Sequence, residues 1–110
     1  PVLAKHDVFI CPTNNAPSVR ADHDPWDPDY RMNGKKVDPE FGWVMTHQFN
    51  MLHNCPVLAV PSGHAASGVP TGIQIVGRTW DDARVFKAGL AYAKALGGWF
   101  TAKGKRPQLG

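Results

Sequence analysis

Two short apolar runs in the middle of the chain dominate its hydrophobic pattern. They occupy residues 57–60 and 73–76, are rich in valine and isoleucine, and are bounded by proline or glycine. Runs of this length and composition are typical of β-strands, here 57–60 and 72–76. Neither run alternates apolar with polar residues along its whole length, which predicts strands covered on both faces, as inside an α/β sheet. The Pro- and Gly-rich segment between them predicts a turn.

The pattern upstream predicts one more strand and a helix. Residues 7–11 form a β-favouring run that stops at a Pro-Thr pair. From residue 39 to residue 53 apolar residues recur at helical spacing, and Asp38 precedes them as a candidate N-cap. The helix is expected to end there because Pro56 follows.

A last helix is expected behind Asp81 or Asp82, with Gly97-Gly98 ending it. Its spacing predicts a buried side made of Val85, Phe86, Leu90, Ala93 and Leu96.

Two segments show neither the helical nor the strand periodicity of apolar residues. Residues 14–37 carry three prolines and predict a loop longer than the ~12–15 residues usual inside a compact domain. Residues 103–110 predict a solvated, flexible tail.

The predicted elements form an α/β fold in which the faces of the strands are only partly covered. Two apolar strands need cover on both faces, and two helices plus loops supply only part of it. The sequence therefore predicts a fragment of a larger mixed β-sheet flanked by helices, with about three strands and two helices in this chain. Such a fragment is expected to bind a hydrophobic dye or to self-associate.

Composition narrows the class of protein. The 110 residues are 43% hydrophobic and 19% charged, which is typical of one globular domain. The net charge of +3, with no aromatic residues alternating with the basic ones, gives no indication of a nucleic-acid partner. No apolar run approaches the ~18 residues of a membrane span. Because the sequence has no secretory signal, Cys11 and Cys55 are expected to be buried thiols in a reducing, cytoplasmic compartment. A disulfide between them is the alternative.

The histidines and acidic residues do not predict a metal site. His47 and His53 are six residues apart, whereas a spacing of four places two imidazoles on one helix face. The triplet Asp22-His23-Asp24 is rich in ligands, but sequence neighbours on a loop rarely converge on one ion.

The sequence gives an equally weak indication of a catalytic nucleophile beside a general base. Ser62 lies in Pro-Ser-Gly with His64 two residues on, and Cys55 lies two residues after His53. A turn serine and a packed thiol are the simpler interpretations of these residues.

Four motifs together resemble a known family. They are the run at residues 7–13 ending in Pro-Thr, the Phe-Asn pair at residues 49–50, the Pro-to-Gly run at residues 56–63, and Gly-Val-Pro-Thr-Gly-Ile-Gln-Ile-Val-Gly at residues 68–77. In this order they resemble the C-terminal part of the amidase signature enzymes. The resemblance covers most of the chain, so residues 1–110 are expected to be the C-terminal portion of an amidase domain.

The resemblance implies an activity without supplying its catalytic residues. The family hydrolyses amides with a Ser–Ser–Lys triad in a Gly- and Ser-rich segment N-terminal to the matched region. The serines of this chain, Ser18, Ser62 and Ser67, do not lie in such a segment. We therefore expect no catalytic residue, cofactor or metal in this chain. Its expected partners are a small-molecule amide substrate and the missing N-terminal part of the same domain.

The resemblance also implies which residues approach the substrate: Thr13, Trp43, Thr46 and Asn50. Packing and turn roles for Trp43 and Asn50 remain an equal alternative.

Two departures from the family pattern matter. The glutamyl-tRNA amidotransferase branch holds the substrate amino group with an Asp three residues before the threonine, and this chain has Trp43 there. That difference argues against glutamine and toward a small or apolar amide. Pro56 follows Asn50 by six residues rather than five, so the local turn must differ. A different class of function, a stand-alone binding module derived from a truncated amidase, also fits the sequence.

Overall fold

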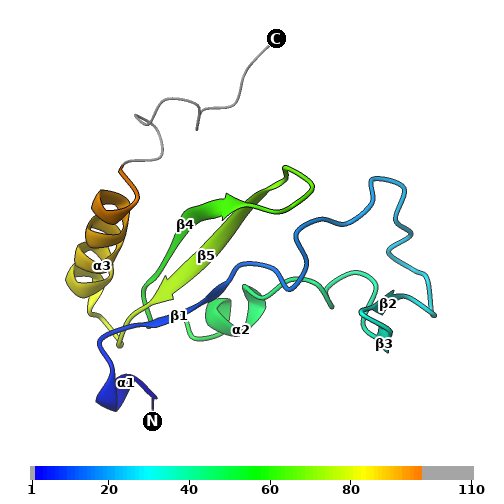
Figure 1. Ribbon diagram of the computed structural model, residues 1–110. Coiled ribbons are helices and arrows are strands. Elements are labelled where there is room, and N and C mark those ends of the chain that lie inside the picture. Colours follow the sequence, from blue (N-terminus) through cyan, green and yellow to red (C-terminus); the bar gives the residue numbers. More distant parts are fainter. Residues whose placement is uncertain (1, 98–110) are drawn as a thin grey trace.

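The computed structural model describes residues 2–97, whose arrangement is shown in Figure 1. Within that range lie three helices and five strands, and the α/β fold class is confirmed. The elements are α1 (Val2–Lys5), β1 (Phe9–Pro12), β2 (Arg31–Met32), β3 (Lys35–Lys36), α2 (His47–Asn50), β4 (Val57–His64), β5 (Pro70–Val76) and α3 (Asp82–Ala95).

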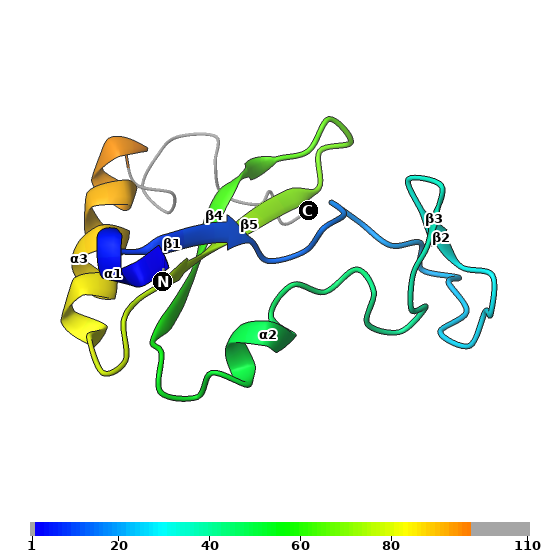
Figure 2. The same ribbon diagram turned by 90° about the horizontal axis from the view of Figure 1, so that it is seen from below.

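The main sheet has the strand order β1-β5-β4, and both pairings are antiparallel (Figure 2). β4 and β5 form a hairpin, and β1 pairs with the other edge of β5. The three predicted strands are confirmed, but the hairpin is longer than expected. Residues 61–64 pair with residues 70–72, so only residues 65–69 remain as the turn.

Burial differs between the two arms of the hairpin. β5 ends in the buried residues Gln74, Ile75 and Val76. β4 alternates between exposed and half-buried positions, and Val57 is 40% exposed. Cover on both faces was therefore a correct expectation for the end of β5 and a wrong one for β4. The physical reason is position, because β5 has a strand on each side and β4 lies at the edge.

The last predicted helix is confirmed as α3. The Asp81 side chain caps it by accepting a hydrogen bond from the Arg84 backbone N–H, at 3.3 Å. Gly97 follows with φ of 74°, the left-handed conformation expected of a helix-ending glycine. Gly98 lies outside the described residues.

The side of α3 that is buried differs in part from the prediction. Val85 and Gly89 are buried against the sheet. A Cβ added at Gly89 would lie 2.4 Å from Leu58 Cδ2, so the helix and β4 approach closely there. Phe86 and Leu90, which were expected to be buried, are 61% and 64% exposed. The apolar stripe of α3 is wider than the part of the sheet that it covers.

The helix predicted for residues 39–53 is mostly wrong. Asp38 does act as a cap, because its Oδ1 accepts from the N–H groups of Glu40 and Phe41. The helix-like turn ends at once, and residues 43–45 instead pair with residues 13–15. Only α2 is helical in this range. Long-range backbone pairing has overridden the local periodicity.

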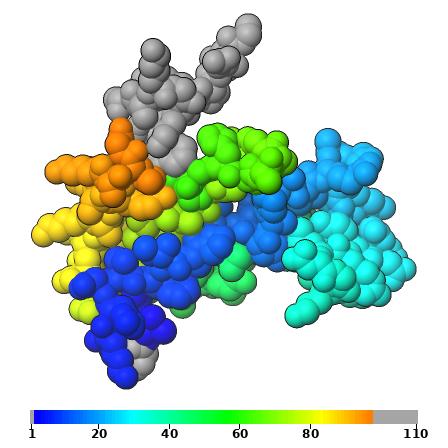
Figure 3. Space-filling model, in the orientation of Figure 1, coloured from blue at the N-terminus to red at the C-terminus, as the bar shows by residue number. Residues whose placement is uncertain are grey.

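Residues 14–37, expected as a loop, contain the small β2–β3 hairpin. Its turn is Asn33-Gly34, with φ of 47° and 77°, the pair typical of a tight hairpin turn. Figure 3 shows this segment, in cyan, as a lobe beside the body of the molecule. Residues 103–110, the expected tail, lie outside the described range.

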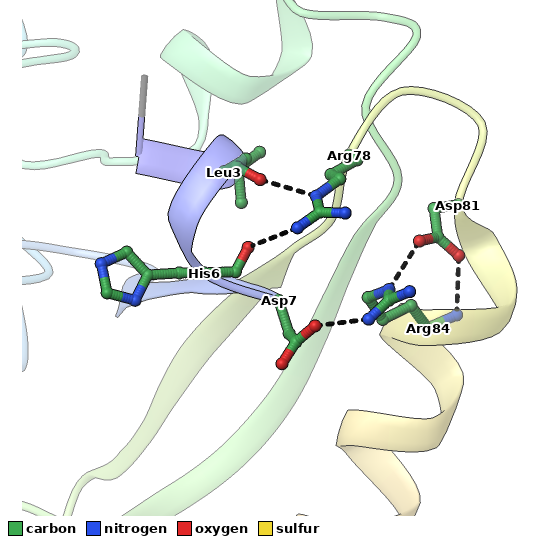
Figure 4. Close-up of polar contacts among 6 residues, drawn as sticks. All are labelled: Leu3, His6, Asp7, Arg78, Asp81 and Arg84. Atoms are coloured by element: carbon green, nitrogen blue, oxygen red, sulfur yellow. Dashed lines mark hydrogen bonds and ion pairs between the residues drawn. The ribbon is translucent and has the colours of Figure 1, made fainter.

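A polar cluster fixes α1 and the start of β1 against the start of α3 (Figure 4). The Arg78 guanidinium donates to the carbonyls of Leu3 and His6, at 2.6 and 3.3 Å. Arg84 pairs with Asp81 at 2.7 Å and also with Asp7. The Arg84 hydrogen bond lowers the pKa of Asp81, and the Asp81 hydrogen bond raises the pKa of Arg84.

Both cysteines are free thiols, Cys11 buried and Cys55 half-buried. Burial raises the pKa of the Cys11 thiol, and a hydrogen bond from Gln74 opposes part of that shift. Between residues 2 and 97 no helix has the length and apolar character needed to cross a membrane.

Candidate functional site

A cavity of about 300 Å³ lies where the end of β1 meets the β4–β5 hairpin. Its lining combines hydroxyl and amide side chains with small apolar ones, and no lining residue is charged. The lining residues are Pro12, Thr13, Asn14, Asn15, Ala16, Pro17, Ser62, Pro70, Thr71, Gly72 and Ile73.

Thr13 is fixed at this cavity by two hydrogen bonds to one carbonyl. Its backbone N–H and its Oγ1 both donate to the Gly72 carbonyl, at 3.0 and 3.1 Å. A Cβ at Gly72 would lie 3.2 Å from Thr13 Oγ1. Glycine at this position therefore lets the threonine side chain lie close against β5.

A β-bulge brings a second pair of hydroxyls to the cavity. Pro61 pairs with Gly72 and Gly63 pairs with Thr71, which leaves Ser62 as the extra residue of β4. The Ser62 and Thr71 hydroxyls are hydrogen-bonded at 2.9 Å. Ser62 was expected to be a turn residue and is instead part of a strand. Gly63 has φ of 148°, a conformation that glycine adopts more readily than other residues.

Gln74 ties the cavity to the segment that precedes α2. Its side chain is 1% exposed, and its Nε2 donates to the carbonyls of Pro12 and Met45, at 3.0 and 3.1 Å. The Met45 N–H in turn donates to the Thr13 carbonyl at 3.0 Å. The buried side-chain amide of Gln74 thus holds residues 43–45 alongside the end of β1. One polar residue inside an apolar run was the sequence signal for this role.

The four residues that the resemblance implicated lie in one region but do not share the cavity. Thr13 lines it, and Trp43 is next to it, because the Asn15 N–H donates to the Trp43 carbonyl at 3.0 Å. Thr46 precedes α2, and its carbonyl accepts from the N–H of Asn50, which is exposed at the end of that helix. Thr46 and Asn50 do not line the cavity.

Trp43 carries one unsatisfied group. Its indole Nε1–H is buried and finds no acceptor among residues 2–97. Buried donors are nearly always satisfied in folded proteins, so an acceptor from elsewhere is expected at this position.

The chemistry of this cavity is that of neutral hydrogen bonding. Ser62 Oγ contacts the Thr71 hydroxyl, which cannot serve as a general base near neutral pH. Threonine, serine and asparagine side chains can bind a neutral polar group. Across residues 2–97, no group of three or more His, Cys, Asp or Glu side chains is arranged to hold a metal ion. His23, in the triplet considered for metal binding, contacts the Pro39 carbonyl through Nε2 at 2.6 Å.

A second cavity, of about 350 Å³, lies near α1 and is apolar. Its only chemically reactive lining group is the Cys55 thiol. The lining residues are Val2, Leu3, Phe9, Phe49, Leu52, Cys55 and Val76.

Comparison with known proteins decides the family. The sequence profile of the amidase family matches residues 2–86, which is most of the chain. The chain belongs to the amidase family. Its membership confirms the resemblance that the four motifs carried.

Curated relatives of this amidase chain are much longer proteins. A glutamyl-tRNA(Gln) amidotransferase subunit from Treponema denticola is 32% identical over 94 residues, covering 83% of this chain and 17% of the relative. The corresponding protein of Oceanobacillus iheyensis is 29% identical over 112 residues, covering 99% and 20%. That of Exiguobacterium sibiricum is 32% identical over 105 residues, covering 93% and 19%. The chain thus spans about a fifth of these relatives. No solved structure matches it.

Proposed function

We propose that this chain is the C-terminal segment of an amidase signature amide hydrolase, to which it contributes sheet strands and part of the wall of the substrate pocket. The family match over residues 2–86 is the observation that carries the proposal. The Ser–Ser–Lys triad comes from polypeptide outside this chain. The cavity of Thr13, Ser62 and Thr71, which has neither a base nor a charge, supports a binding role rather than a catalytic one.

In the intact enzyme the pocket wall consists of the cavity residues Thr13, Ser62 and Thr71 together with Trp43, Thr46 and Asn50, which lie outside the cavity in this chain. Trp43 stands where the glutamyl-tRNA amidotransferase branch has an Asp, so a small or apolar amide fits this wall better than glutamine. The buried indole N–H of Trp43 then has its acceptor in the rest of the enzyme or in the substrate. Two free thiols fit a reducing, cytoplasmic setting.

The test compares the 110-residue chain with the whole polypeptide encoded by its reading frame. The whole polypeptide is expected to hydrolyse simple aliphatic and aromatic amides, and a serine-directed fluorophosphonate is expected to label it outside these 110 residues. The chain alone is expected to show neither hydrolysis nor labelling. Inhibitor-sensitive amide hydrolysis by the purified chain would contradict the proposal.

A stand-alone binding module is the second candidate. It is favoured by one observation, that Ile75, Val76 and Val85 are buried by the chain's own described residues. A reading frame that starts beside residue 1 would support this module, and a frame that continues upstream into a Gly- and Ser-rich segment would support the hydrolase.

A further inference from the structure

The outer edge of β4 has backbone hydrogen-bonding groups without a partner strand among residues 2–97. The Gly77 N–H donates to the Pro56 carbonyl at 2.9 Å, and the register continues with Leu58 opposite Ile75. In an antiparallel pair, alternate residues point their N–H and C=O groups toward the partner and away from it. The backbone groups of Val57 and Ala59 therefore point away from β5. No strand among residues 2–97 pairs with them.

The opposite edge of the sheet is better covered. Beyond β1, residues 43–45 pair with residues 13–15 through an antiparallel bridge between Asn14 and Val44. Pro12 lacks an N–H, and its carbonyl accepts from Gln74. Within β1 only Ile10 directs both its N–H and its C=O away from β5, whereas β4 does so at Val57 and at Ala59. The two edges are thus unequal, and β4 has the longer open stretch.

Helix α3 extends over this open edge. Arg84 lies on the flank of the helix that faces Asp7, ahead of β1, as Figure 4 shows. Phe86 lies about 200° around the helix from Arg84, at 100° per residue, and Leu90 is one turn further along. Because the strand order is β1-β5-β4, the flank of Phe86 and Leu90 faces beyond β4. Both side chains are mostly exposed.

The opposite face of β4 is apolar at the same edge. Register neighbours share a face, so Leu58 points toward α3 and Val57 points away from it. Val57 and Ala59 are both exposed there. The unpaired edge is therefore bordered by apolar side chains on both faces of the sheet, as the interior of a wider sheet would be.

Pro61 sets the limit of this edge. It has no N–H to donate, and its carbonyl accepts from the Tyr92 hydroxyl at 3.2 Å. Strand pairing beyond Pro61 is therefore blocked, which leaves Val57 to Ala59 as the open stretch.

We propose that this stretch of β4 pairs with a β-strand from the rest of the amidase domain, and that this strand lies beneath Phe86 and Leu90. The proposal rests on the proposed function and adds to it the edge at which the sheet continues. The length of the relatives, about five times that of the matched segment, supports this occupant. A second copy of the chain fits less well, because Lys87 and Lys94 flank Leu90 and a twofold contact would bring like charges together.

The experiment measures the same variants in the 110-residue chain and in the whole encoded polypeptide. Hydrogen exchange is expected to show the Val57 and Ala59 amides protected on the order of 100-fold more strongly in the whole polypeptide than in the chain. Ala59→Pro removes the outward donor and is tolerated on a free edge. It is therefore expected to lower the melting temperature of the whole polypeptide. In the 110-residue chain its melting temperature is expected to match that of Ala59→Val, which keeps the donor.

A second pair of variants tests whether a strand lies beneath Phe86 and Leu90. Leu90→Lys places a charge where a paired strand would bury it, whereas Ala91→Lys places the same charge on an exposed position of the same helix. In the whole polypeptide Leu90→Lys is expected to lower the melting temperature well below that of Ala91→Lys. In the chain the two are expected to melt alike.

Three outcomes would overturn the proposal. Equal exchange of the Val57 and Ala59 amides in both polypeptides, with an active enzyme, would exclude this edge and leave the proposed function intact. Concentration-dependent protection of these amides in the chain alone would assign the edge to a second copy. A reading frame that starts beside residue 1, or an inactive whole polypeptide, would remove the proposed function itself.

Discussion

β4 and β5 are the two arms of one hairpin and have similar apolar runs, yet they have different surroundings. β5 lies between two strands, and its residues Gln74, Ile75 and Val76 are buried. β4 has a strand on one side and alternates between half-buried and exposed positions. An apolar run therefore predicts that a strand needs cover, whereas the neighbouring elements decide whether that cover is present.

The largest expected difference between the arms comes from truncating their apolar side chains. Ile75→Ala removes a side chain that is 1% exposed and is expected to lower the free energy of unfolding by about 3 kcal/mol. Val57→Ala, at an exposed position of β4, is expected to cost less than about 0.5 kcal/mol. Urea unfolding of the chain, followed by circular dichroism, measures both. Equal losses would contradict the contrast between the arms.

The buried amide of β5 gives the next effect. Gln74→Leu is expected to lower the free energy of unfolding by about 2 kcal/mol, because the carbonyls of Pro12 and Met45 lose their donor. Gln48→Leu, the same change at an exposed glutamine, serves as the control and is expected to be near neutral. If both variants unfold alike, Gln74 does not hold residues 43–45 to β1.

The hydroxyl pair that joins the arms at the bulge should have a smaller effect. A double-mutant cycle with Ser62→Ala and Thr71→Val is expected to give a coupling free energy of about 1 kcal/mol. Urea unfolding of the two single variants and the double variant supplies the cycle. Strict additivity of the two changes would show that the hydroxyls do not interact in solution.

The smallest effect concerns the cap of α3, the helix that covers both arms. The pKa of Asp81 is lower in the folded chain than its ordinary value of 3.8, chiefly because of the Arg84 hydrogen bond. Its stabilisation is therefore complete above that ordinary value and is lost as the pH falls through the folded-state pKa. Asp81→Asn keeps a capping side chain without the charge. We expect the melting temperature of this variant to fall less between pH 7 and pH 3 than that of the wild type, and a parallel fall would assign the acid sensitivity to other carboxylates.

Local pattern was sufficient for the strands and for α3, because their breakers and caps lie within the segments themselves. Asp81 caps the helix, and Gly97 follows it in a left-handed conformation, as expected. The Asn33-Gly34 turn was also a local signal, and it was overlooked in a segment interpreted as a loop.

The remaining features depend on distant partners. The sequence of residues 43–45 continues a helical periodicity. In the structure they instead pair with residues 13–15, which no local pattern indicates. The bulge at Ser62 follows from the register of the whole hairpin. At the candidate site, Thr13 was identified through the family resemblance, whereas Ser62 and Thr71 required the structure. The exposure of Phe86 was unpredictable because it depends on where the sheet ends.

Hydrogen exchange at single residues of the isolated 110-residue chain tests most directly whether β4 is an open edge. An open edge predicts slow exchange for the Leu58 and Val60 amides, which point toward β5, and exchange at least about 10-fold faster for Val57 and Ala59. Equally slow exchange of all four amides, independent of protein concentration, would show that the chain closes its own sheet and that β4 is not an open edge.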